Sequence, residues 1–99
     1  MPRHRPLVPD LLPPWVKSAT NDCLISVAEE AYAAQKFADE WGAFDTPSCE
    51  GPLRAAAKSL AVLNDERASS EKRCAAGERA ARKFWEAKVC ARQRQRGVA

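Results

Sequence analysis

The sequence has little that acid–base or phosphate chemistry would need. It has one histidine, His4, and four glycines, none of which form a glycine-rich phosphate loop. It has no Cys-x-x-Cys pair of the kind that redox enzymes use. No apolar run approaches the roughly 18 residues of a membrane-spanning helix, so no span is expected. We therefore expect no catalysis, no cofactor, no metal and no small-molecule substrate.

Strand signals are also lacking, because β-branched residues nowhere alternate with polar ones. Apolar residues instead recur at spacings of three and four in three stretches, near 22–41, 51–63 and 70–94. Capping residues precede the first stretch, and Ser69-Ser70 precede the third. The sequence predicts an all-α chain, a helical hairpin or three-helix bundle. Most of the periodic residues are alanines, so we expect closely approaching helices and a thin core.

Proline is concentrated at the N-terminus, where the first fourteen residues hold five of the seven. Proline removes an amide donor, so this segment forms neither a secretory signal nor an amphipathic targeting helix. We expect an extended arm over residues 1–17, a helical domain over 18–94 and a basic tail over 95–99. The apolar side chains of Leu11, Leu12 and Trp15 favour an arm lying in a groove of a partner. The alternative is an arm folded back on its own domain.

Four cysteines, Cys23, Cys49, Cys74 and Cys90, are separated by 26, 25 and 16 residues. Zinc sites usually contain a close Cys-x-x-Cys pair, so this spacing does not favour zinc. In a reducing compartment all four would be inert buried thiols. The remaining interpretation is that the four cysteines form two disulfides.

Helix geometry discriminates among the three possible pairings. In an up-down-up bundle, Cys23 and Cys74 lie in the first turns of the first and third helices, at one end. Cys90 lies about 24 Å along the third helix from Cys74, at the end where Cys49 precedes the second helix. A disulfide needs Cα atoms within roughly 7 Å, so Cys23–Cys74 and Cys49–Cys90 are the expected pairs. Each would close a loop of about 40–50 residues and contribute roughly 4 kcal/mol. The prediction requires that the second and third helices are not one continuous rod.

Disulfides in a chain without a visible signal peptide indicate the mitochondrial intermembrane space, because proteins imported there by oxidative trapping need no signal peptide. The four-cysteine helical pattern resembles the small mitochondrial coiled-coil-helix–coiled-coil-helix proteins, several of which are accessory subunits of respiratory complexes. The usual two Cys-x9-Cys pairs are not present, because Ala33 and Phe84 stand at the second positions.

Two segments add to this resemblance. The end Cys90–Arg96 (CARQRQR) is similar to the C-terminal segment of the PDSW subunits of complex I, which also have a Val-Pro-Asp upstream, as at 8–10 here. Asp65–Ser70 is similar to the interhelical turn of the hinge subunit of the cytochrome bc1 complex. The resemblance implies a non-catalytic accessory structural subunit of a respiratory complex, and complex I is the first candidate. It also implies a location on the intermembrane-space side, peripheral to the inner membrane. The alternatives are a small basic mitochondrial ribosomal protein that contacts RNA, or an assembly factor of a respiratory complex.

Charge is distributed unevenly along the chain. Residues 23–66 carry three basic and eight acidic side chains, whereas residues 67–96 carry ten basic and three acidic ones. The two regions can attract each other within the bundle. In the alternative, Arg92, Arg94 and Arg96 bind acidic neighbouring subunits or anionic lipid headgroups. Aromatic residues among the basic ones are limited to Phe84 and Trp85, so a nucleic-acid partner is not favoured.

Three tryptophans, Trp15, Trp41 and Trp85, exceed what narrow alanine stripes can bury. Tryptophan and arginine are favoured anchors of protein interfaces. We therefore expect at least one tryptophan, above all Trp15, to be buried only when a partner is bound, and we count Trp85 among the partner-binding residues.

Overall fold

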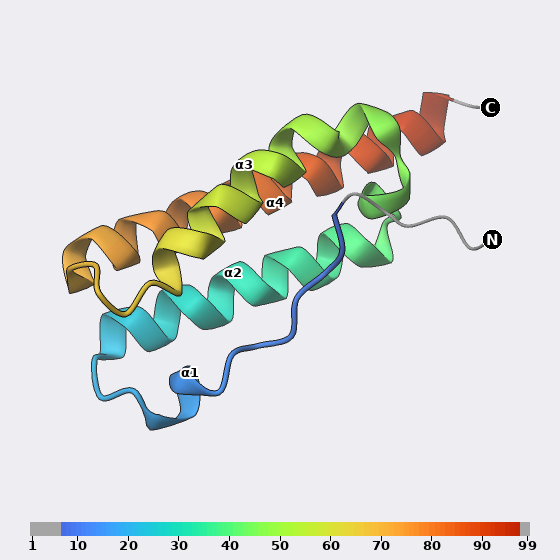
Figure 1. The fold of residues 1–99 in the computed structure, drawn as a ribbon. Helices are drawn as coiled ribbons and strands as arrows, with labels where there is room; N and C mark the ends of the chain where they lie inside the picture. The colour runs from blue at the N-terminus through green and yellow to red at the C-terminus, as the bar shows by residue number, and fades with distance from the viewer. Residues whose placement is uncertain (1–6, 98–99) are drawn as a thin grey trace, which may run out of the picture.

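Three long helices form the body of the fold (Figure 1). The computed structural model describes residues 7–97, with side chains through Gln95. The long helices are α2 (Asp22–Glu40), α3 (Glu50–Leu63) and α4 (Ser70–Gly97). A single turn, α1 (Trp15–Ser18), precedes them, and two 3₁₀ turns, η1 (Ala43–Asp45) and η2 (Pro47–Cys49), connect α2 to α3. Residues 7–97 contain no strand, so the all-α prediction is confirmed.

Short polar side chains and one glycine set the helix boundaries. Asn21 caps α2, because its side-chain oxygen accepts a hydrogen bond from the Leu24 amide at 3.1 Å. Gly42 follows α2 with a φ of 79°, the left-handed conformation that commonly stops a helix. Between α3 and α4, Asp65 accepts from the Arg67 amide and Ser69 accepts from the Lys72 amide. These contacts compete with helical hydrogen bonds, so α3 and α4 are separate helices, as expected.

The helix α4 packs against both α2 and α3 over much of its length. Figure 1 shows that α2 and α4 run in the same direction. The helix α3 runs in the opposite direction, from the end of α2 back to the start of α4. The up-down-up arrangement expected from the sequence is therefore present.

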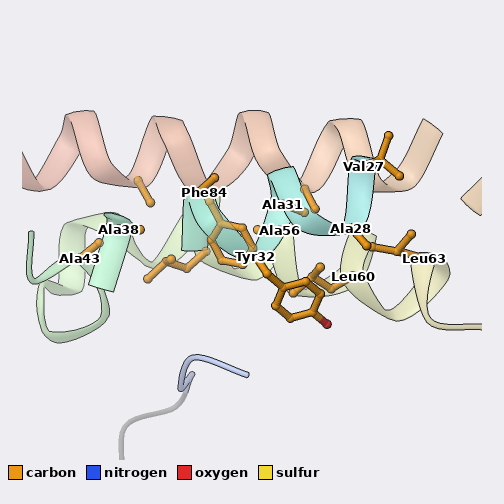
Figure 2. Close-up of a cluster of buried hydrophobic side chains, with 14 of the residues drawn as sticks. Val27, Ala28, Ala31, Tyr32, Ala38, Ala43, Ala56, Leu60, Leu63 and Phe84 are labelled. Atoms are coloured by element: carbon orange, nitrogen blue, oxygen red, sulfur yellow. The ribbon is translucent and has the colours of Figure 1, made fainter. Parts of the chain in front are cut away.

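The core is built largely from alanine, with a few large side chains among them (Figure 2). Ala28, Ala31, Ala38, Ala56, Ala80 and Ala87 are completely buried. Phe84 is the main anchor, 2% exposed, and its ring centroid lies 6.3 Å from that of Phe44. The helices α2 and α4 lie close together at Gly77, where an added Cβ would lie 2.6 Å from Val27 Cγ2. The close approach predicted from the small residues is confirmed.

Two details differ from the sequence-based expectations. The apolar periodicity of the first stretch extends to residue 41, but Trp41 follows the last residue of α2 and is 37% exposed. We also predicted that the last helix ends near Arg94, whereas α4 continues through Gly97. Arginine and glutamine are good helix formers, and the Gln95 side chain donates to the Trp41 carbonyl at 2.6 Å, which holds this extra turn against the end of α2.

Candidate functional site

The four cysteines lie in two pairs, one near each end of the bundle. Cys23 and Cys74 are hydrogen-bonded neighbours where α2 and α4 begin, and Cys49 and Cys90 are neighbours at the other end. Cys90 Sγ also lies 3.7 Å from the Ser48 carbonyl oxygen. All four are free thiols in the structure, close to one another but not bonded. The structure therefore brings together the partners expected from helix geometry, while the disulfides themselves stay a prediction.

Each pair combines one buried thiol with one more accessible thiol. Cys49 and Cys74 are buried, whereas Cys23 is exposed and Cys90 is partly exposed. Burial, together with a smaller contribution from the neighbouring thiol, raises the pKa of Cys49 and of Cys74 to about 11. At neutral pH both buried sulfurs are therefore neutral thiols and poor nucleophiles. This arrangement suits structural cross-links rather than a reactive cysteine.

A polar cluster that sequence reasoning missed holds the start of the chain against α3. The Trp15 indole N–H donates to Asn64 Oδ1 at 2.8 Å, and the Asn64 amide donates to the Tyr32 hydroxyl at 3.0 Å. The buried Arg73 donates through Nε to the Leu63 carbonyl at 2.8 Å, and its guanidinium lies 4.7 Å from the Trp15 ring centroid. Burial raises the pKa of the Tyr32 hydroxyl.

Trp15 is therefore half-buried within its own chain rather than left free for a partner. Asn64 and Arg73 contact this tryptophan within its own chain, and its further burial by a partner stays a prediction. The next residue, Val16, is 5% exposed and belongs to the core.

The remaining part of the predicted arm, residues 7–14, is extended and runs along α2 (Figure 1). Leu7 packs against the core, and the side-chain amide of Gln35 pairs with the backbone N–H and C=O of Asp10 at 3.0 Å. Leu11 is 91% exposed and Leu12 is 44% exposed. The described part of the arm thus lies on its own domain, and Leu11 and Leu12 still present apolar surface outward.

The other predicted partner-binding residues lie on α4. Trp85 is 51% exposed, and Lys88 Nζ lies 4.0 Å from its ring centroid. The Arg92 guanidinium lies 5.8 Å from the Trp41 ring centroid, and Arg94 is exposed. The side chain of Arg96 and all of His4 lie outside the described residues.

Sequence reasoning also missed a groove between α2 and α4. It holds about 750 Å³ and is lined by Glu30, Ala33, Ala34, Phe37, Glu78, Ala81, Arg82, Trp85 and Glu86. Its sequence signal was available, because Phe37 precedes Trp41 by one helical turn and Trp85 precedes Val89 by one turn. These four apolar residues flank the buried stripes rather than lying in them.

Within the described part of the chain, no group of three or more histidine, cysteine, aspartate or glutamate side chains could hold a metal ion. None of the helices in residues 7–97 combines the length and apolar character that a membrane crossing needs. The functional features described above are thiol pairs, a polar cluster and exposed apolar surfaces, which suit binding and cross-linking.

The chain was compared with models of known families, with curated proteins and with solved structures. None of the three comparisons found a match.

Proposed function

We propose that this chain is a non-catalytic accessory structural subunit of a mitochondrial respiratory complex, with complex I as the first candidate. In this proposal it lies in the intermembrane space, peripheral to the inner membrane, and its cysteines form the disulfides Cys23–Cys74 and Cys49–Cys90. Its partners are other protein subunits, with anionic lipid headgroups as a further contact of the basic C-terminal end.

The observation that carries the proposal is the pairing of all four thiols at the two ends of α4. Within each pair the two thiols interact but are not bonded. Two cross-links would each close a loop of about 40–50 residues and would each contribute roughly 4 kcal/mol in the chain-entropy account. For a thin alanine core this is comparable with the ~5–15 kcal/mol that stabilises a typical domain. Such cross-links persist only in an oxidising compartment.

The surface supports a binding role rather than a catalytic one. Leu11 and Leu12 point outward from a segment that is itself held on the domain through Asp10 and Gln35. Arg92 and Arg94 are exposed near the end of a rigid helix. The resemblance of Cys90–Arg96 to the end of PDSW subunits is the reason for placing complex I first.

Peptide mapping without reductant tests the cross-links. Full-length protein from mitochondria is alkylated, digested and analysed by mass spectrometry, and the expected peptides join Cys23 to Cys74 and Cys49 to Cys90. Four alkylated cysteines, or either of the other two pairings, would overturn the disulfide part of the proposal.

Fractionation of the same mitochondria tests the location. We expect the chain to become protease-sensitive when the outer membrane is ruptured, and to migrate with complex I on a native gel. Protection until the inner membrane is opened, with salt-sensitive sedimentation beside the ribosome, would instead favour the RNA-contacting alternative. Migration as a free protein that joins only immature complexes would favour an assembly factor.

A further inference from the structure

The groove between α2 and α4 carries exposed aromatic side chains that no other described segment covers. Its floor consists of Ala33, Ala34 and Ala81, and Phe37 and Trp85 form its aromatic side. The N-terminal arm covers another side of α2, where Gln35 and Asp10 meet, and so leaves this groove open.

Large exposed hydrophobic residues are concentrated here. Phe37 is 47% exposed, Trp41 37%, Trp85 51% and Val89 36%. The other large exposed hydrophobics among the described residues all belong to the arm. Residues i and i+4 share a helix face, so Phe37 lies next to Trp41 at the end of α2, and Trp85 lies next to Val89 on α4. Together these four side chains form one strip, which follows the groove and continues beyond it toward the end of α2. A strip of this kind marks an interaction surface.

The charges along this strip differ between its two ends. Glu30 and Glu78 lie toward the end where α2 and α4 begin. Lys88 lies toward the other end, where its Nζ is 4.0 Å from the Trp85 centroid and 5.6 Å from the Phe37 centroid. Arg82 and Glu86, one charge of each sign, line the groove between these ends. Along α4 the strip is therefore acidic at its first charge and basic at its last, and its two middle charges are opposite in sign.

We propose that this strip binds a second copy of the same chain in an antiparallel, two-fold symmetric dimer. A two-fold axis perpendicular to α4 places the acidic end of each copy opposite the basic end of the other. The surface is therefore complementary to itself, as an isologous interface requires. The inference concerns the isolated chain and does not rest on its proposed location.

The spacing on α4 fits one axis. Residues 81 and 85 are equidistant from position 83, and so are residues 78 and 88. An axis at that level places Trp85 of each copy over the alanine floor around Ala81 of the other. The same axis places Lys88 opposite Glu78 of the second copy. A large ring thus meets small side chains while opposite charges meet at the rim, which is the arrangement typical of a protein interface.

The first test is the molar mass of the purified chain in solution. It is measured by light scattering and sedimentation from about 1 µM to about 200 µM, with a reductant present to exclude intermolecular disulfides. We expect a concentration-dependent rise to twice the chain mass. Trp85→Glu should remain monomeric over this range with unchanged helical circular dichroism. The matched control is Leu11→Glu, an exposed residue of the arm, which should dimerise as the unaltered chain does.

The second test reverses the charges. Lys88→Glu and Glu78→Lys should each raise the dimer dissociation constant at least tenfold, since each change affects two symmetric contacts. The double variant should recover dimerisation, because it restores opposite charges in exchanged positions.

Three results would overturn the proposal. These are a monomer at every concentration, a dimer that Trp85→Glu leaves intact, and a double variant as weak as the single ones. The first result would mean that another molecule covers the strip, and it would leave the proposed structural role unaffected.

Discussion

Adding one methyl group at Gly77 should destabilise the fold, although glycine is the poorest helix former after proline. A Cβ at this position would lie 2.6 Å from Val27 Cγ2 and 2.8 Å from Val27 Cβ. Both distances are well below ordinary carbon–carbon contact, and both atoms belong to a stiff β-branched side chain on a packed helix. Overpacking of this kind costs about 1–3 kcal/mol. Because both contacts would be shorter than 3.0 Å, we expect the upper part of that range, about 2–3 kcal/mol. Replacing glycine by alanine in a helix returns about 1 kcal/mol.

The expected net loss for Gly77→Ala is therefore about 1–2 kcal/mol of unfolding free energy. For a domain of this size that corresponds to a fall in Tm of about 5–10 °C, measured by circular dichroism. Gly51 provides the matched control, because a Cβ there meets no atom within 4 Å. Gly51→Ala also lies in a helix and should raise stability by up to about 1 kcal/mol.

The cause is tested by a double-mutant cycle with Val27→Ala. This change removes the methyl group that a Cβ at Gly77 would meet, so the double variant should be more stable than the sum of the two single effects predicts. If Gly77→Ala stabilises the protein as Gly51→Ala does, or if the two changes are additive, then α2 and α4 do not approach as closely as described.

Three further measurements test the rest of the fold. Trp15→Phe should cost about 1 kcal/mol in urea unfolding, because Asn64 Oδ1 loses its donor; an unchanged midpoint would mean that this hydrogen bond adds no stability. In the reduced protein, the folded state raises the pKa of Cys49 and Cys74 from 9.0 to about 11, so their contribution to stability is complete below pH 9 and is lost as pH rises through 11. The Tm of the reduced chain should fall over that range more steeply than that of a variant with serine at both positions. Phe84→Ala should cost about 3–5 kcal/mol by leaving a cavity, and a loss below 1 kcal/mol would show that the core collapses around it.

The helices and their order could be predicted from local sequence because the signals are local. The spacing of alanines marks the faces that pack, and Ser69 marks where the last helix begins. The pairing of the thiols was also predictable, since it follows from the rise per residue along a continuous helix and from the alternating direction of three helices.

The polar cluster around Trp15 could not be predicted in the same way. Its partners, Asn64, Tyr32 and Arg73, come from three different helices or their ends, and no spacing along the chain relates them. Trp15 as a partner anchor rested on residue type alone. Residue type favours an interface, but it cannot indicate that a side-chain acceptor 49 residues away is within 2.8 Å.

The position of α4 explains why the cysteines and the groove matter together. Both α2 and α3 pack chiefly on α4, so the fold depends on the packing of this one helix against both of the others. Its two cysteines lie next to different elements: Cys74 lies beside Cys23 on α2, and Cys90 lies beside Cys49 just before α3. Oxidation would therefore join each flanking helix to α4 at one end, and neither bond would duplicate the other. Because both bonds would lie near the ends, the middle of the α2–α4 face would stay free of cross-links, and the groove there would keep its exposed aromatic residues available for binding.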